Sequence, residues 1–439
     1  MNYKKFFELA KSNNINESEF RYRKESSLSF SLFKHELTNY TTSIQSSIVG
    51  RGIYNNRMGF SITEDLSNKG IEFLIKGIKD TAQIMSSKEE PIIFKGSDKY
   101  HKHNLFNKEL TAVPIEKKLE LLRVLEDEAY ALDKRVSKVV VEFEESEEES
   151  LYTNSYGLYL KNKENYFVYS IEVVANQNEE TKSSFEIYLG DDFTKFNPKE
   201  LAKKAVDKVL KKFNGVSIKN KLYKAILSDK VVSTFVGTLV SFCNAEDIQY
   251  KSSLFVDKLN TQVVSKKLTI EEKPLTKNFF FTYFDGEGVA CYNKKIIDKG
   301  ILKTYLYNLQ TAKKDGVPTT ANAVMAGSKS SIGTVNLFVK PGKLSEDQLF
   351  EKIKNGVYIT SVSGLHAGLN KQSGDFSLEA EGFVVENGKI SSPLKLITIG
   401  GNILKLFKDI IALGSNNELH LSSTTCPSMA IKNLNVSSL

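Results

Sequence analysis

The sequence is poor in cysteine and lacks long apolar runs, and both shortages exclude classes of protein. Its three cysteines, Cys243, Cys291 and Cys426, lie far apart and show no Cys-x-x-Cys spacing, so neither a disulfide framework nor a zinc knuckle is indicated. No apolar run approaches the ~18 residues that a membrane-spanning helix needs. The first residues form a short apolar stretch interrupted by Glu8, which is unlike a signal peptide. We therefore expect a globular cytoplasmic protein with no role at a membrane.

Arginine is also scarce. The chain has 439 residues and a net charge of +7, yet only six arginines, the last of them Arg135. Hydrogen bonding to the edges of bases and bidentate binding of phosphate both favour the planar arginine side chain over lysine. A modest excess of lysine is typical of a solvated surface. Nucleic acid is therefore not an expected partner.

Common catalytic motifs are missing as well. Neither phosphate-binding loop, GxxxxGK[ST] or GxGxxG, is present, and the GxSxG turn of serine hydrolases is absent. His35-Glu36 begins like the zinc motif HExxH, but Asn39 stands where the second ligand belongs. That segment also has a strand pattern, whereas a helix is needed to bring both ligands to one face. His101 and His103 lie in a polar segment with no third ligand nearby, so we expect a solvated loop.

The other candidate groups also have simple structural interpretations. His366 lies among small residues in Ser363-Gly-Leu-His-Ala-Gly368, where it would line a turn or pocket, and without a partner histidine we expect a hydrogen-bonded structural role. The acidic run from Glu142 to Glu149 lacks the spacing of a calcium loop, so we expect a solvated strand end and loop. No cysteine has an identifiable activating base, so we expect buried, inert thiols.

The first part of the chain alternates helix and strand patterns. Apolar residues at helical spacing predict helices over 65–85 and 114–132, and Asn197-Pro198 opens a third. Strand patterns cover 28–33, 44–54, 138–144, 166–174 and 185–189. These alternations predict an N-terminal mixed α/β domain, residues 1–217, with helices on a sheet. A polar, glycine-containing link near 213–220 would end it.

The second part, residues 218–439, is mostly strands and glycine turns with few helices. Ser345 and Gln348 form the sequence of a capping box and predict a helix that Gly356 would end. A second helix is predicted over 403–413, and Asn387-Gly388 predicts a tight hairpin. The whole chain is therefore predicted to be α+β, with a strand-rich C-terminal domain.

The C-terminal half also contains an ordered series of motifs. They are Asp285-Gly-Glu-Gly288, Asp298-Lys-Gly-Ile-Leu-Lys-Thr-Tyr-Leu-Tyr-Asn308, Thr311-Ala-Lys-Lys-Asp-Gly316, Gly364-Leu-His-Ala-Gly-Leu-Asn370, Ser373-Gly-Asp-Phe-Ser377, Ala380-Glu-Gly-Phe383, Gly388-Lys-Ile390, Pro393-Leu-Lys395, Gly401-Asn402 and Cys426-Pro-Ser428. This series resembles the TldD/PmbA family, and the Gly-Leu-His-Ala-Gly and Ser-Gly-Asp-Phe forms resemble its PmbA (TldE) branch. Weaker matches at Gly50-Arg-Gly52, Arg57-Met-Gly-Phe60 and Asn154-Ser-Tyr-Gly157 extend the resemblance over almost the whole chain.

One departure from the family pattern bears directly on activity. In the TldD branch, a helix before the segment that matches Ser252-Ser-Leu-Phe255 has the motif HExxxH, whose histidines bind zinc. Here the matching stretch is Val236-Gly-Thr-Leu-Val-Ser241, which offers no ligand or base. Cys426 aligns with the family's last strand, after that branch's cysteine ligand. We therefore expect no catalytic and no metal-binding residue in this chain.

The resemblance implies a PmbA/TldE-like subunit without bound cofactor. It would dock with a TldD-like metallopeptidase subunit that holds the zinc, and act on unfolded proteins, peptides or peptide precursors. The family-signature residues that become candidates for peptide binding are Ser363, Gly364, His366, Gly368, Ser373, Gly374, Asp375 and Phe376. A homodimer of the isolated chain stays open. So do two alternatives: a stand-alone hydrolase with a non-metal site near His366, and a regulator that binds DNA or gyrase.

Overall fold

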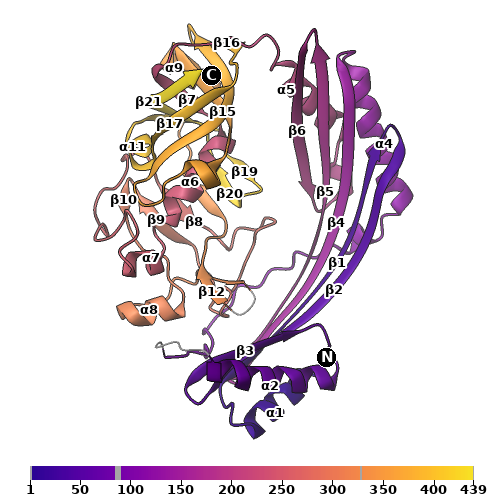
Figure 1. Cartoon of the computed structure of the whole chain (residues 1–439), viewed down its shortest axis with the longest axis vertical. Helices are drawn as coiled ribbons and strands as arrows, with labels where there is room; N and C mark the ends of the chain where they lie inside the picture. The colour runs from indigo at the N-terminus through magenta and orange to yellow at the C-terminus, as the bar shows by residue number, and fades with distance from the viewer. Residues whose placement is uncertain (1, 85–89, 327–328, 439) are drawn as a thin grey trace. The chain divides into compact units, whose positions relative to one another are not determined.

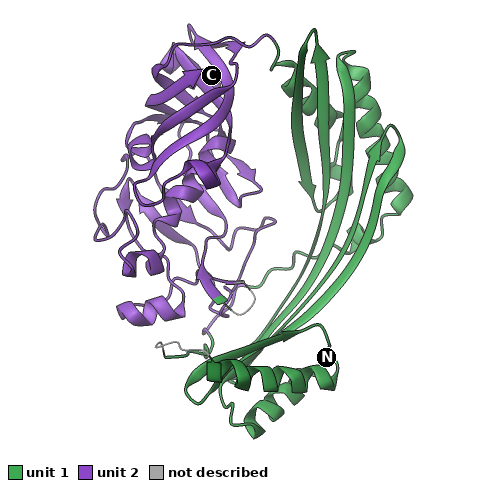
Figure 2. Ribbon diagram, in the orientation of Figure 1, with its two compact units in different colours: residues 1–96, 102–213, 326–329 green, residues 97–101, 214–325, 330–439 purple. Residues whose placement is uncertain are grey.

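The computed structural model describes residues 2–84, 90–326 and 329–438. The chain divides into two compact units, each with its own hydrophobic core. Unit 1 comprises residues 1–96, 102–213 and 326–329, and unit 2 comprises residues 97–101, 214–325 and 330–439 (Figure 2). Both units mix helices and strands, as predicted for an α+β protein. No helix in the described part of the chain is long and apolar enough to cross a membrane.

Unit 1 is built on a six-stranded antiparallel sheet of long, curved strands (Figure 1). Its order is β3-β2-β1-β4-β5-β6. The strands are β1 (Ser18–Phe33), β2 (Glu36–Tyr54), β3 (Arg57–Thr63), β4 (Val136–Asn154), β5 (Tyr159–Gln177) and β6 (Glu180–Gly190). Strands β1, β2, β4, β5 and β6 are longer than the strands predicted in the same regions.

The acidic run shows why the predicted strands were too short. Residues Glu142 to Glu149 do not form a strand end and loop, as predicted, but lie in the middle of β4. Toward the end of this run, cross-strand ion pairs take the place of apolar contacts, with Glu149 2.7 Å from Lys161 of β5 and Glu148 2.8 Å from Arg23 of β1. Opposite charges on neighbouring strands stabilise a sheet. Strands are predicted from alternating apolar residues, and a strand segment rich in charged side chains lacks this alternation.

Helices pack on this sheet at separate places. The helices of unit 1 are α1 (Tyr3–Ser12), α2 (Asn68–Ile84), α3 (Lys108–Thr111), α4 (Ile115–Leu132) and α5 (Pro198–Leu210), with a 3₁₀ turn, η1 (Phe193–Lys195). Helices α4 and α5 contact each other and β4 to β6, whereas α2 contacts β2 and β3. The predicted apolar face of α2, from Ile71 to Ala82, is buried, and the predicted helical position Met85 lies outside the described residues.

The described residues of unit 2 form three sheets. The first has the order β14-β7-β21-β17-β15-β16, with β18 beside β21, and a further pairing of β14 with β15 closes it into a ring. The second has the order β10-β9-β8-β13-β20-β19, and the third pairs β11 with β12. The strands are β7 (Lys221–Leu227), β8 (Ile270–Glu272), β9 (Lys294–Asp298), β10 (Ile301–Leu302), β11 (Ala323–Ala326), β12 (Lys329–Ile332), β13 (Leu337–Val339), β14 (Gly356–Ser363), β15 (Asp375–Glu386), β16 (Lys389–Pro393), β17 (Ile397–Asn402), β18 (Ile410–Leu413), β19 (Glu418–His420), β20 (Thr424–Cys426) and β21 (Met429–Ser438).

Short helices connect these strands, and two predicted helix ends were wrong. The helices are α6 (Asp229–Ser241), α7 (Ala245–Gln249), α8 (Leu309–Asp315), α9 (Glu346–Ile353), α10 (Leu365–Gly368) and α11 (Ile403–Lys408). The helix predicted over 403–413 stops at Lys408, and its last part is strand β18, because a short apolar run fits a buried strand as well as a helix. The Ser345 capping box is confirmed, but α9 ends at Ile353 and Gly356 begins β14. The predicted hairpin turn is confirmed, with φ of 52° at Asn387 and 77° at Gly388.

Candidate functional site

The family-signature residues come together around the short helix α10 of unit 2. Ser363 is the last residue of β14, Gly364 precedes α10 with φ of 78°, and Asp375 begins β15. An antiparallel bridge between Leu369 and Phe376 joins the two sides of this segment. The side chains of Ser363 and His366 are exposed, so this surface is open to a ligand. Binding of a peptide there stays a prediction.

Several of these residues stabilise the segment itself through hydrogen bonds, ring packing or backbone conformation. The amide of Asn402 donates to the Asp375 carboxylate at 2.9 Å, and this hydrogen bond, helped by Ser373, lowers the pKa of Asp375 below its ordinary value. Phe376 is buried and its ring lies 5.1 Å from that of Phe235 in α6. Gly374 has φ of 77°, which favours glycine. In the part of the chain that the structure describes, no hydrogen bond links His366 to Ser363 or Asp375.

The stretch that replaces the zinc motif lies in the last half of α6. Val236 and Leu239 are fully buried in the core of unit 2. The hydroxyls of Thr238 and Ser241 donate to carbonyls of the preceding turn, those of Thr234 and Thr238. Zinc binds nitrogen, thiolate and carboxylate ligands, so this helix does not fit the metal. Across residues 2–84, 90–326 and 329–438, no three His, Cys, Asp or Glu side chains form a group that could hold an ion.

The cysteines are buried, as predicted, and burial raises the pKa of each thiol above its ordinary value. Cys426, in β20, donates its S–H to the carbonyl of Asp229 at 3.1 Å. His420 lies on the neighbouring strand β19 with Nε2 3.9 Å from the Asp229 carboxylate. Burial is the main cause that lowers the His420 pKa, and the nearby carboxylates oppose it. A neutral thiol and a neutral imidazole are poor starting points for nucleophilic catalysis.

His35 lies in a turn rather than in the predicted strand. With Lys34 it connects β1 to β2, and its φ is 62°. The backbone N–H groups of Lys34 and His35 donate to the buried carboxylate of Glu126 in α4, at 2.6 and 2.9 Å. The imidazole Nε2 lies 2.8 Å from Asp127. The histidine therefore belongs to an anchored turn of unit 1.

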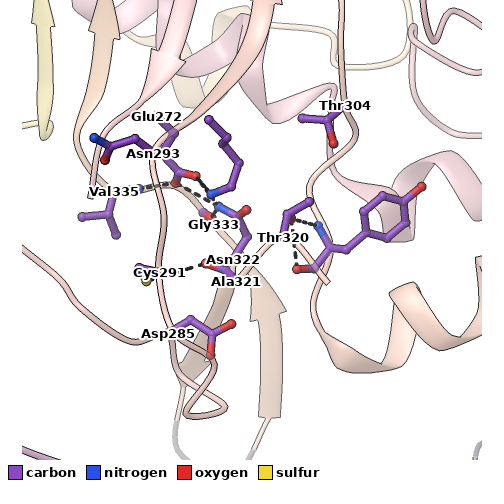
Figure 3. A network of polar contacts seen from close by, with 12 residues as sticks. Glu272, Asp285, Cys291, Asn293, Thr304, Thr320, Ala321, Asn322, Gly333 and Val335 are labelled. Atoms are coloured by element: carbon purple, nitrogen blue, oxygen red, sulfur yellow. Dashed lines mark hydrogen bonds and ion pairs between the residues drawn. The ribbon is translucent and has the colours of Figure 1, made fainter. Parts of the chain in front are cut away.

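Unit 2 also contains a cavity that the sequence did not reveal. Its volume is about 300 Å³, which is the lower end of the range for small-ligand sites, about 300–1,000 Å³. It is lined by Glu272, Pro274, Thr282, Phe284, Asp285, Gly286, Cys291, Ala321, Asn322, Ala323, Val324, Met325, Gly333 and Val335. Figure 3 shows Glu272, Asp285, Cys291 and Asn322 from this lining, with the polar contacts among the residues drawn.

Glu272, at the end of β8, organises one side of the cavity. It forms a buried ion pair with Lys294 of β9 and is 2% exposed. Its carboxylate also accepts hydrogen bonds from the Asn322 amide at 2.9 Å and from the backbone N–H of Val335 at 2.9 Å. A buried charge is tolerated when it is paired and hydrogen-bonded. This network therefore fixes the position of Asn322 (Figure 3).

Asp285 forms the other acidic part of the cavity wall. Its carboxylate accepts three backbone N–H groups, from Glu287 and Val289 at 2.9 and 3.0 Å and from Ala323 at 3.0 Å. Burial is the main cause that raises its pKa to about 7; the charge of Glu287 adds to it and the backbone hydrogen bonds oppose it. The signal in the sequence was Asp285-Gly-Glu-Gly288, but nothing there indicated that Glu272 and Asn322 lie beside it.

Comparisons with known proteins agree with these features. Residues 108–213 match the model of the PmbA/TldA metallopeptidase central domain, and residues 220–438 match that of the C-terminal domain. A PmbA metalloprotease homologue of Buchnera aphidicola is 30% identical over 68% of this chain and 65% of its own length. Metalloprotease PmbA of Escherichia coli O157:H7 is 26% identical over 87% of this chain and 84% of its own length.

Solved structures give the same fold. A Thermotoga maritima protein described as a proposed modulator of a DNA gyrase superposes with a TM-score of 0.91 at 27% identity and covers 99% of both chains. TldE of Thermococcus kodakarensis superposes with a TM-score of 0.89 at 19% identity over both whole chains, a likeness of fold. The chain is therefore a homologue of PmbA metalloproteases and belongs to the PmbA/TldD metallopeptidase family.

Proposed function

We propose that this chain is the PmbA/TldE-like subunit of a zinc-dependent peptidase complex and that the zinc is bound by a TldD-like partner. The observation that supports this most directly is α6. The part of this helix where the TldD branch has HExxxH has buried valine and leucine side chains instead. Hydrolysis by zinc needs about three protein ligands and an activated water. The chain would thus contribute to a peptidase without performing the chemistry.

We further propose that domain 1–217 and domain 218–439 act together on unfolded proteins, peptides or peptide precursors. The exposed residues around α10, including Ser363, His366 and Ser373, are the candidates for contact with peptide. Strand-rich surfaces of this kind are a general means of holding an extended chain.

The test is a pull-down from native lysate with the tagged full-length chain, followed by separation of the subunits and elemental analysis. The proposal expects an HExxxH-bearing partner that holds all of the zinc. Stoichiometric zinc on this chain, together with peptide cleavage by this chain alone, would refute it.

A matched variant separates this proposal from a stand-alone hydrolase. His366→Ala removes an exposed imidazole and leaves α6 unchanged. If the complex assembled with this variant hydrolyses peptide at the wild-type rate, His366 is not a general base. Loss of turnover with a retained fold and retained partner binding would favour the hydrolase instead.

A further inference from the structure

The two edges of the unit 1 sheet differ in how they are covered. At the β6 edge, Lys208 of α5 donates from Nζ to the backbone carbonyl of Phe185 at 3.2 Å. Lys212, which follows α5, donates from Nζ to the carbonyl of Ser183 at 2.9 Å. Lysines on an edge strand are a common means of preventing it from pairing with another chain. The β6 edge is therefore protected.

The opposite edge, β2, is open along its first part. Strand β3 pairs with β2 only from Ile48 to Tyr54, whereas β1 continues beside β2 as far as Glu36. Residues 37–47 thus have a neighbouring strand on one side only, and Figure 1 shows this part of β2 at the outer margin of the sheet. Among the residues that the structure describes, no side chain hydrogen-bonds to their backbone. The segment also contains no lysine and no proline, so it lacks the usual protection of an edge.

One face of this open edge has exposed apolar side chains. Tyr40 is 47% exposed and Ile44 is 72% exposed. Tyr40 lies opposite Phe30 of β1, with ring centroids 6.3 Å apart, and Phe30 in turn stacks on Phe143 of β4 at 4.8 Å. Ile44 lies four residues from Tyr40 on the same strand and so on the same face. The apolar packing that crosses the sheet therefore ends in solvent at β2.

A second copy of β2 is complementary to this edge. Side chains directly opposite each other in an antiparallel pair lie on the same face and contact each other. A two-fold axis at Thr42 would place Tyr40 of each copy opposite Ile44 of the other and would place Thr42 opposite itself. Aromatic side chains opposite β-branched ones, and threonine opposite threonine, are favourable pairs.

The other face of the edge is compatible with the same register. Asn39 would lie opposite Gln45, and Thr41 opposite Ser43, which are all uncharged. Like charges opposite each other would oppose pairing, and residues 37–47 contain no charged side chain. The pairing of β2 with β1 is regular from Asn39 onward, because the one irregularity lies before it. The segment is therefore a regular strand that can pair with a copy of itself.

We propose that this chain forms a two-fold symmetric dimer in which residues 39–45 of β2 pair antiparallel about Thr42, so that two unit 1 sheets join into one. The seven residues span only about 24 Å, so we expect a reversible dimer, weaker than an obligate one. The inference rests on unit 1 alone and does not depend on the proposed peptidase role. An unrelated extended peptide would use the same backbone groups, but it would not require the self-complementary register.

The test is sedimentation velocity of the purified full-length chain at increasing concentrations, where a reversible monomer–dimer equilibrium is expected. Thr42 is exposed, so its replacement should leave the fold intact. Thr42→Lys places two ammonium groups opposite each other at the axis and should weaken the dimer at least about tenfold. Thr42→Glu should do the same with two carboxylates. Thr181→Lys, the same change at an exposed position of β6, is the matched control and should leave the dimer unchanged.

An equimolar mixture of the Thr42→Lys and Thr42→Glu variants should restore the dimer, because opposite charges then meet at the axis. Only a contact in which position 42 meets itself predicts this recovery. A wild-type chain that stays monomeric, a dimer that Thr42→Lys does not weaken, or a mixture of folded variants that stays monomeric would each overturn the proposal. A monomeric chain that binds a labelled peptide of residues 37–47 and its scrambled form equally would instead make this edge a general peptide-binding site.

Discussion

Replacing Asp285 by asparagine should remove a large part of the pH dependence of this protein's stability. The pKa of Asp285 is raised from 3.8 to about 7, chiefly by burial. The native state therefore holds a proton that the unfolded state releases between these two values. The contribution of this proton is fully present below pH 3.8 and is lost as the pH rises toward 7. One pH unit corresponds to 1.36 kcal/mol, so the displacement of about three units amounts to about 4 kcal/mol.

The substitution also has a local cost. Asparagine can still accept from Glu287 and Val289, but its Nδ2 would face the N–H of Ala323, which Asp285 Oδ2 now accepts at 3.0 Å. Leaving that buried N–H without an acceptor should destabilise the variant by about 1–3 kcal/mol. The variant should thus be less stable at acidic pH and should match or exceed the wild type near pH 8.

The assay is urea unfolding followed by circular dichroism at intervals from pH 4 to pH 8. Asp257→Asn, which removes one carboxylate at an exposed position, is the control and should keep the wild-type pH profile. If Asp285→Asn and the wild type lose stability in parallel across this range, Asp285 is not protonated in the native state and the reasoning fails.

Two further predictions concern stability. Glu19→Gln should destabilise the protein by about 3–5 kcal/mol, because it leaves the buried guanidinium of Arg51, now 3.0 Å from Glu19, without its carboxylate; chemical unfolding measures this, and a loss below 1 kcal/mol would contradict it. Gly382→Ala should be strongly destabilising, since its Cβ would lie 2.1 Å from the carbonyl oxygen of Tyr358. Gly237→Ala is its control: nothing lies within 4 Å of the added Cβ, so helix α6 should gain up to about 1 kcal/mol. Equal melting temperatures for the two variants would refute the comparison.

The sequence predicted several elements in which one face is apolar and the other polar. Helices α2 and α4 were recognised from helical spacing, because each buries one apolar face on the sheet of unit 1. The long strands were cut short, because much of β2 and the middle of β4 are solvated and have charged or hydroxyl side chains on both faces. In these segments the register between strands depends on which side chains face each other across the strands, and the periodicity of one sequence segment does not contain that information.

The two candidate sites also differ in how far the sequence could predict them. The residues from Ser363 to Phe376 are close in sequence, so a local motif was enough to find the surface around α10. The cavity needs Glu272, Asp285 and Asn322, which come from three separate segments. No spacing rule joins such positions, and each residue alone has an ordinary structural interpretation. Only the folded chain brings Asn322 and the two carboxyl groups into the wall of one cavity.

The most direct test of the central claim is the zinc content and peptidase activity of this chain, purified alone and then mixed with a TldD-like subunit. The apolar α6 predicts that the chain alone, after exposure to zinc and gel filtration, retains no stoichiometric metal and cleaves no peptide. Zinc and hydrolysis should both appear with the partner and disappear when the partner's first HExxxH histidine is replaced by alanine. One zinc per chain with peptide cleavage in the absence of any partner would contradict the account.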